Sequence, residues 1–405
     1  MLKRFCLLVA GLMGLAVPGG AVVPSVPFYI LQPPAGQIDN LFEAIATPTG
    51  FLVTFARSTG SVPPFTLYTQ RFSKTGAKQG KAVKFDGPGT VGDHAEMVML
   101  NSTTAAAVWF ASVNGAPSLK IGKLNLETGA VTNIKDLGES DDHIHDVVRL
   151  SNGNLAVITA QVDAQGMRYA NKIKIVSSNF ATVKNWFSVH GNGFPLDAWA
   201  YIDQTVVEKD TGGIALYRDH VTNKIVGRNF TNAGQLGTNI NVSTTAMQAF
   251  AVSDIAYLEV KAARLSNGKI AVCWVHNGTT GADRYDVRCR VLTASGTAAG
   301  DDFLVHADKT GGQVAPEVIA LPGGLFSVTW VQIDNTFPAA IKYRTFDSSG
   351  KPKFGERVAS TLTDLAFTPF NTEAVLLADG SIAQVMGPSA FVPGLRGAGI
   401  ASPHK

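Results

Sequence analysis

Alternating apolar and polar residues predict a β-hairpin that recurs along the chain. Its clearest copy covers residues 261–274, KAARLSNGKIAVCW, in which two alternating stretches flank a Ser-Asn-Gly turn. Asn-Gly between two apolar runs is typical of a two-residue type I′ turn, because both residues tolerate positive φ. We therefore expect seven hairpins, since six further copies of this plan begin at Glu43, Glu96, Asp146, Thr205, Glu317 and Glu373.

The spacing of the hairpins predicts a closed repeat fold. Each hairpin is followed by a third strand that ends in a glycine turn, as in VRCRVLTASG from Val287, and then by a fourth strand. The residue that opens the second strand recurs at intervals of 50 to 59 residues, at Phe51, Ala105, Leu155, Ile214, Ile270, Phe326 and Ile382. A period of this size in an all-β chain predicts a β-propeller, here with seven four-stranded blades.

The two ends of the chain are expected to complete one blade together. Residues 26–32, VPFYILQ, form a strand with no partner before it, whereas the last repeat lacks its outer strand. In a circular array the N-terminal strand fills this gap, which closes the ring and leaves no exposed interior edge.

The repeat also resembles a known family. The motif LxxGxxxVxW followed by RxF/LxxxG is similar to the repeats of sialidase-like and other bacterial secreted propellers, over roughly residues 26–400. The resemblance implies a propeller fold and, as one functional alternative, a glycoside hydrolase. The sialidase Asp-box, SxDxGxxW, does not occur in the chain, so the catalytic residues of that family are not transferred to it.

The first 21 residues have the layout of a secretory signal peptide. Lys3 and Arg4 precede an apolar run over residues 5–17, and small residues follow it. Cleavage after Ala21 leaves residues 22–405 as one propeller domain, which we expect to be secreted or periplasmic and monomeric. No other run of about 18 apolar residues occurs, so we expect no stable membrane span.

The charge of the mature chain excludes one class of partner. Loss of the two cations Lys3 and Arg4 lowers the formal net charge from +3 to about +1. A nearly neutral chain without a block of Lys and Arg argues against nucleic acid as the partner.

Two cysteines remain after the signal peptide, one on each side of a single predicted hairpin. If His276 pairs with Asp286, Cys273 lies opposite Cys289 on the same apolar side of the sheet. An oxidising exported compartment favours a disulfide between them. Two small buried residues that happen to be cysteines are the alternative.

Side chains that recur at one position of the repeat are expected to serve the blade. The aromatic residues Phe55, Trp109, Trp274 and Trp330 share one position of the second strand, which indicates packing between blades. Five repeats carry an acidic residue seven positions before the first turn, at Glu43, Glu96, Asp146, Glu317 and Glu373. If the first strand is innermost, this ring of carboxylates faces the central channel. There it suits a Ca²⁺ ion, or each carboxylate binds backbone N–H groups of its neighbour; no other cofactor is expected.

Three connections between blades depart from the repeat, and they enter the third, fourth and fifth blades. They cover residues 137–146, 189–203 and 244–260. Aromatic rings beside carboxylates and amides are typical of sugar sites, although they also suit a loop that packs onto a blade. We assign ligand contact to His143, His145, Trp199, Tyr201 and Tyr257.

Three functions are compatible with this sequence. The leading hypothesis is an exported binding module that recognises a glycan or a protein on the face with the long connections. The second is a sialidase-like glycoside hydrolase that uses a pair among Asp142, Asp197 and Asp254. The third is a structural or adaptor propeller in an envelope assembly. No Ser-His-Asp order, HExxH or CxxC motif is present, so we favour binding over catalysis.

Overall fold

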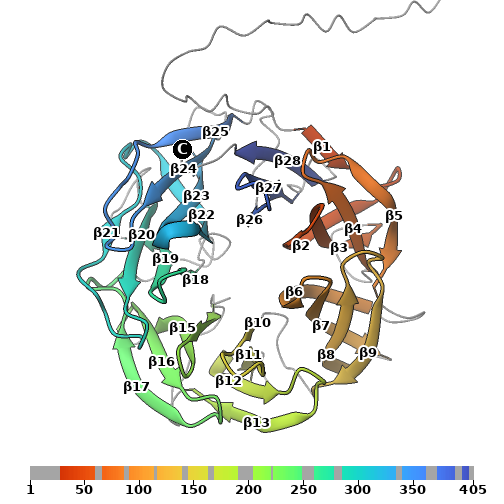
Figure 1. The fold of residues 1–405 in the computed structure, drawn as a ribbon, viewed down its shortest axis with the longest axis horizontal. Coiled ribbons are helices and arrows are strands. Elements are labelled where there is room, and N and C mark those ends of the chain that lie inside the picture. The colour runs from red at the N-terminus through yellow and green to blue at the C-terminus, as the bar shows by residue number, and fades with distance from the viewer. Residues whose placement is uncertain are drawn as a thin grey trace, which may run out of the picture.

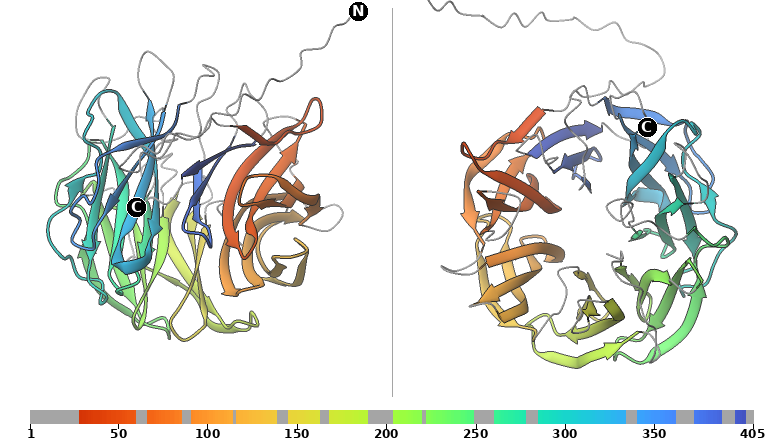
Figure 2. Two further views of the ribbon diagram at one scale, coloured as in Figure 1. Left: turned by 45° about the horizontal axis from the view of Figure 1, so that its top comes forward. Right: turned by 180° about the vertical axis from the view of Figure 1, so that it is seen from behind.

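The described residues form a ring of antiparallel sheets around a central opening (Figure 1). The structure is a computed structural model, and it describes residues 28–59, 66–85, 91–113, 116–138, 145–162, 168–189, 204–219, 222–248, 260–277, 285–333, 340–361, 372–387 and 395–400. Within these ranges the strands make seven sheets of four strands each. The predicted all-β propeller with seven four-stranded blades is therefore confirmed, and Figure 2 shows the same ring tilted and from behind.

Each of the first six blades is built from four consecutive strands. Blade 1 contains β2 (Ile38–Thr47), β3 (Gly50–Ser58), β4 (Thr66–Ser73) and β5 (Lys78–Lys84). Blade 2 contains β6 (Val91–Asn101), β7 (Thr104–Val113), β8 (Ala116–Asn125) and β9 (Val131–Asp136). Blade 3 contains β10 (His145–Arg149), β11 (Leu155–Val162), β12 (Arg168–Val176) and β13 (Thr182–Ser188). Blade 4 contains β14 (Gln204–Lys209), β15 (Gly212–Asp219), β16 (Lys224–Phe230) and β17 (Leu236–Asn241). Blade 5 contains β18 (Val260–Arg264), β19 (Ile270–Asn277), β20 (Tyr285–Leu292) and β21 (Phe303–Leu304). Blade 6 contains β22 (Gly312–Ala320), β23 (Phe326–Ile333), β24 (Ala340–Phe346) and β25 (Arg357–Thr361).

Blade 7 joins the two ends of the chain. It consists of β26 (Thr372–Leu376), β27 (Ile382–Met386), β28 (Leu395–Ile400) and the N-terminal strand β1 (Phe28–Leu31). Strand β1 runs antiparallel to β28, with Phe28 opposite Gly397 and Tyr29 opposite Arg396. The predicted closure by the N-terminal strand is confirmed.

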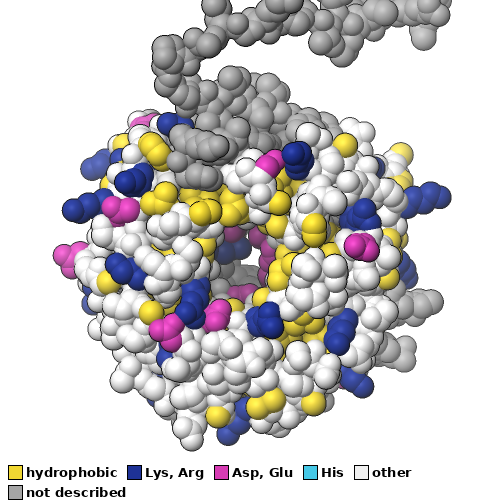
Figure 3. Space-filling model, in the orientation of Figure 1, with side chains coloured by type: hydrophobic (Ala, Val, Ile, Leu, Met, Phe, Trp, Pro, Cys, Tyr) yellow, Lys and Arg dark blue, Asp and Glu magenta, His cyan; other side chains and the backbone are white. Residues whose placement is uncertain are grey.

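The first strand of every blade is the innermost one. Each of these strands contacts the first strand of the next blade, and β2 contacts β26, so the inner strands alone already close a circle. The space-filling view in Figure 3 shows an opening at the centre of this circle. Among the described residues no helix is long and apolar enough to cross a membrane; the single helical segment they contain is the 3₁₀ turn Pro322–Gly324.

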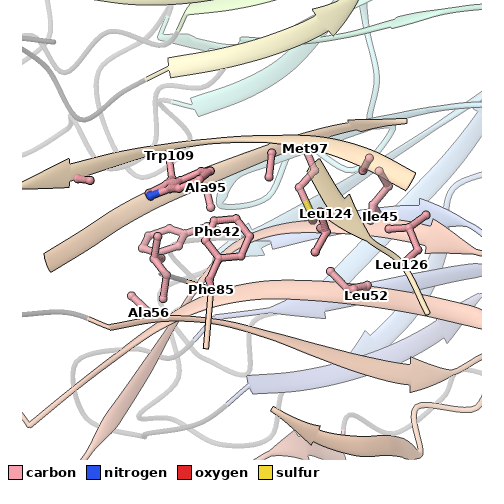
Figure 4. Close-up of a cluster of buried hydrophobic side chains, with 14 residues drawn as sticks. Phe42, Ile45, Leu52, Ala56, Phe85, Ala95, Met97, Trp109, Leu124 and Leu126 are labelled. Carbon is pink, nitrogen blue, oxygen red and sulfur yellow. The ribbon is translucent and has the colours of Figure 1, made fainter. Parts of the chain in front are cut away.

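Apolar side chains between neighbouring blades form the core. In the cluster between blades 1 and 2, Trp109 of β7 lies with Phe42, Met97 and other buried side chains, and its ring meets Phe85 edge-on (Figure 4). Two other tryptophans occupy the equivalent position of their blades, and all three are at most 1% exposed: Trp109, Trp274 and Trp330. The predicted role of this repeated aromatic position in packing between blades is confirmed.

The turn of the Ser-Asn-Gly hairpin differs from the prediction. Gly268 N–H donates to the Leu265 carbonyl oxygen, and Leu265 N–H donates to the Lys269 carbonyl oxygen. The loop therefore has three residues, and of these Gly268 has the positive φ, at 84°. The two-residue type I′ turn was wrong because one left-handed residue after an ordinary turn closes this hairpin, and glycine supplies it.

The register around the two cysteines agrees with the sequence. His276 lies opposite Asp286, and Cys273 lies opposite Cys289 on β19 and β20. The structure joins the two sulfur atoms in a disulfide inside an apolar cluster between blades 5 and 6.

Three inner strands continue past the channel position. Strands β2, β6 and β22 have 10, 11 and 9 residues, and each contains a register shift just before its channel-facing acid. The described parts of β10, β14, β18 and β26 have 5, 6, 5 and 5 residues, and each starts one residue before its channel-facing side chain. The residues that precede these four strands lie outside the described ranges.

Candidate functional site

Seven side chains, one from each inner strand, form a ring around the channel. Every member stands seven residues before the first turn of its blade. In Figure 3 acidic side chains line the opening, with basic side chains among them. The ring consists of Glu43, Glu96, Asp146, Thr205, Lys261, Glu317 and Glu373.

Lys261 is the ring member that a search for acidic residues missed. Its Nζ lies 3.0 Å from Oε1 of Glu317 and 3.3 Å from Oε1 of Glu373, so one ammonium joins the inner strands of blades 5, 6 and 7. The signal was present, because Lys261 stands seven residues before Gly268 just as the acids stand before their turns. Searching by position rather than by residue type finds it.

The acids of blades 7, 1 and 2 influence one another's ionisation. Burial, together with the neighbouring acids, raises the pKa of Glu43 well above its ordinary value and that of Glu96 to about 7. Burial also raises the pKa of Glu373, and the charge of Lys261 opposes this rise.

Asp146 is held by the neighbouring blade. Its Oδ2 accepts hydrogen bonds from the Thr205 hydroxyl at 2.6 Å and from the Val206 N–H at 2.9 Å. The alternative in which channel carboxylates bind backbone N–H groups of the next blade thus describes Asp146. Among the described residues no group of three or more His, Cys, Asp or Glu side chains is arranged to hold a metal ion. The calcium hypothesis for Glu43, Glu96, Asp146, Glu317 and Glu373 therefore gains no support from the geometry.

The structure describes one of the five predicted ligand residues. His145 lies in strand β10 rather than in a loop, is 4% exposed, and has its Nε2 2.9 Å from the Val108 carbonyl oxygen of blade 2. Direct ligand contact by His145 stays a prediction; the structure encloses its side chain between two blades. The other predicted residues lie outside the described ranges: His143, Trp199, Tyr201 and Tyr257, together with the catalytic candidates Asp142, Asp197 and Asp254.

The blades that the three long connections enter are neighbours in the ring. Strand β14 contacts both β10 and β18. Each of these strands starts one residue before its ring member, namely Asp146, Thr205 or Lys261. The chain consequently arrives at the channel ring in three adjacent blades.

Comparisons with known proteins support the fold. No protein-family model matches the sequence, and no curated protein matches it. Among solved structures, a protein of unknown function from Dyadobacter fermentans aligns at 14% identity over 81% of this chain and 99% of that chain, with a TM-score of 0.50. An α-L-arabinanase from Penicillium chrysogenum in complex with arabinobiose aligns at 11% identity over 79% of this chain and 95% of that chain, with a TM-score of 0.49. The NanB sialidase from Streptococcus pneumoniae aligns at 8% identity over 96% of this chain and 71% of that chain, with a TM-score of 0.47. Identities this low concern the fold and not the activity.

Proposed function

We propose that the protein is an exported propeller that binds a glycan on the face where the long connections enter blades 3, 4 and 5. The observation that carries this proposal is that the three connections that depart from the repeat lead into three adjacent blades, whose inner strands β10, β14 and β18 each place a channel residue at their second position. A rigid ring that presents several loops at one place is a common arrangement for recognition.

The chain length between candidate and ring residues keeps the candidates near one another. Tyr201 precedes the ring member Thr205 by four residues, and Tyr257 precedes Lys261 by four. Four residues span at most about 14 Å even when fully extended. Aromatic rings within that distance of a ring of carboxyl groups offer both an apolar face and hydroxyl-binding groups to a sugar.

An oligosaccharide array tests the proposal. The mature protein, residues 22–405, is probed on immobilised neutral and acidic oligosaccharides together with Trp199→Ala and Trp330→Ala. Losing a stacked aromatic typically costs about 1–3 kcal/mol, roughly five- to a hundred-fold in affinity. We expect Trp199→Ala to weaken binding at an unchanged melting temperature. Trp330 is 1% exposed, so Trp330→Ala should lower the melting temperature instead. Absence of binding to every oligosaccharide would remove the glycan proposal and favour a protein ligand or an adaptor role.

One observation favours an enzyme as the second candidate. Glu96 has its pKa raised to about 7 by burial beside the other acids, so a protonated carboxyl group is present in the channel at neutral pH. A carboxylic acid that stays protonated near pH 7 is what a glycosidase needs as its general acid. Release of reducing sugar from the array oligosaccharides, abolished in Glu96→Gln, would establish hydrolysis; binding without release supports the binding module.

A further inference from the structure

The start of the connection between blades 4 and 5 is fastened to blade 5 by a buried ion pair. Thr244 donates hydrogen bonds from its backbone N–H and from its hydroxyl to Oδ2 of Asp302, both at 2.6 Å. The other oxygen, Oδ1, accepts two hydrogen bonds from the Arg288 guanidinium, at 3.0 Å from Nε and 2.5 Å from Nη2. The Asp302 side chain is 1% exposed and that of Arg288 is 25% exposed, so water competes little for these bonds.

Other contacts hold the same segment over its described length, residues 242–248. Arg290 Nη1 donates to the Val242 carbonyl oxygen at 3.0 Å. Arg218 Nη2 donates to the Gln248 carbonyl oxygen at 3.0 Å, and Gln248 N–H donates to the Asn277 carbonyl oxygen at 2.8 Å. The segment is thus tied to blades 4 and 5 until the last residue before 249–259.

Blade 6 repeats the arrangement on the next connection. Lys342 pairs with Glu356 at 2.6 Å, and Glu356 Oε2 accepts hydrogen bonds from the N–H groups of Ala307 and Asp308. Base and acid are 14 residues apart in both blades, so the two pairs occupy the same position of the repeat. In both blades an ionised acid accepts hydrogen bonds from the backbone of the connection that leads into that blade.

The two connections differ in what they lead to. Beyond Asp308 the chain reaches β22 at Gly312 within four residues. Beyond Gln248 it runs through 249–259, which contains Asp254 and Tyr257, before β18 begins at Val260. We infer that the Arg288–Asp302 pair is a positioning device that fixes where the ligand-binding connection of blade 5 begins. This inference rests on the proposed function, since it assigns to that site a residue pair that positions the loop.

The ionisation of Asp302 agrees with this role. Burial raises its pKa, but the hydrogen bonds from Thr244 and Arg288 outweigh burial and hold the pKa below its ordinary value. Asp302 therefore stays charged across the neutral range, and its grip on Thr244 does not vary with pH there.

Two matched variants test the inference. Asp302→Asn keeps the size of the side chain and removes its charge, and Glu356→Gln does the same in blade 6. Amide hydrogen exchange of the mature protein measures directly how strongly Asp302 protects the Thr244 N–H and the residues that follow it. A charge-assisted hydrogen bond is worth enough for exchange at residues 244–248 to speed up roughly ten-fold or more in Asp302→Asn. Glu356→Gln should leave that segment unchanged and speed up exchange at residues 307–308.

The oligosaccharide array supplies the second measurement. We expect Asp302→Asn to bind the array oligosaccharides roughly five-fold or more weakly and Glu356→Gln to bind them like the wild type. Unchanged exchange at 244–248 in Asp302→Asn overturns the inference whatever the array shows. Faster exchange with unaltered oligosaccharide binding overturns the link between the pair and the ligand. If the wild type itself binds no oligosaccharide, the proposed function fails, and the link to a ligand fails with it, while the exchange data still decide whether the pair fixes the segment.

Discussion

At the scale of single residues, one position of the repeat carries different chemistry in different blades. The channel position holds an acid in five blades, a hydroxyl group at Thr205 and an ammonium group at Lys261. The ammonium balances Glu317 and Glu373 by direct ion pairs, whereas burial and the neighbouring acids raise the pKa values of Glu43 and Glu96. The negative charge of the ring is thus reduced in two ways. An ammonium group acts next to the acids of blades 6 and 7, and raised pKa values act at the acids of blades 1 and 2.

Replacing Lys261 separates these two means. Lys261→Met removes the ammonium but keeps the length of the side chain, which leaves Glu317 and Glu373 without their ion pairs. Breaking a buried pair in this way costs about 3–5 kcal/mol when it is fully enclosed, and less here because the Lys261 side chain is 32% exposed. Both acids can take up protons in the variant, so we expect a large loss of stability at pH 8 and a smaller one at pH 5. Urea unfolding at the two pH values measures this, and an equal loss at both would contradict it.

The disulfide between Cys273 and Cys289 can be tested in solution. The two residues face each other in register at a sequence separation of 16. Free-thiol titration of the unfolded, unreduced mature chain should find no thiol. Two titratable thiols per chain would show that the cysteines are only buried neighbours.

Single residues differ in how far the sequence reveals them. The register of Cys273 and the packing of Trp109, Trp274 and Trp330 follow from alternation within a strand, which is a local property. His145 was assigned to a connection rather than to a strand because the sequence does not show where a connection ends and a strand begins. Its neighbour in space, Val108, is 37 residues away along the chain.

At the scale of elements, strands were predictable and turns less so. Alternating burial follows directly from the apolar pattern, whereas the Ser-Asn-Gly turn depends on which residue takes the left-handed conformation. The bulges in β2, β6 and β22 have no clear pattern in the sequence. They matter because they extend the inner strands of blades 1, 2 and 6 beyond the ring residue.

The N-terminal strand offers a test at this scale. Deleting residues 22–34 removes β1, exposes the edge of β28 and breaks the only pairing that joins the two ends of the described chain. We expect a clear fall in the melting temperature although few core side chains are lost, because blade 7 loses its outer strand and the hydrogen-bonding edge of β28 becomes exposed. The matched control deletes residues 401–405, beyond β28, and should melt like the mature protein. An unchanged melting temperature after deletion of β1 would contradict closure by that strand.

At the scale of the whole molecule, repetition made the fold predictable and left the function open. The interval between hairpins depends on blade size. Because the same hairpin pattern occurs in all seven blades, a pattern that is weak in one blade becomes clear from its repetition. The candidate site depends on residues that do not repeat, and for these the chain provides a single example each. Sequence therefore located the blades whose connections differ, while the ring chemistry and the grip of Asp302 on Thr244 required the geometry.

The raised pKa of Glu96 predicts how stability depends on pH. Glu96 has an ordinary pKa of 4.5 and a pKa of about 7 in the folded protein, so the folded state holds its proton more tightly. Its contribution to stability is present below about pH 4.5 and is lost as the pH rises through about 7. Glu96→Gln keeps the size of the side chain and does not titrate.

The difference in unfolding free energy between the wild type and Glu96→Gln measures the contribution of Glu96. Groups that do not interact with Glu96, such as His276, whose pKa burial lowers, affect both proteins alike and cancel in the difference. We expect the wild type to lose stability relative to the variant, by a few kcal/mol, between about pH 4.5 and pH 8. Glu127, an exposed acid in a turn of blade 2, provides the control, because Glu127→Gln should show no such pH dependence. A difference that stays constant over this range would mean that Glu96 is ionised in the folded ring and would contradict its raised pKa.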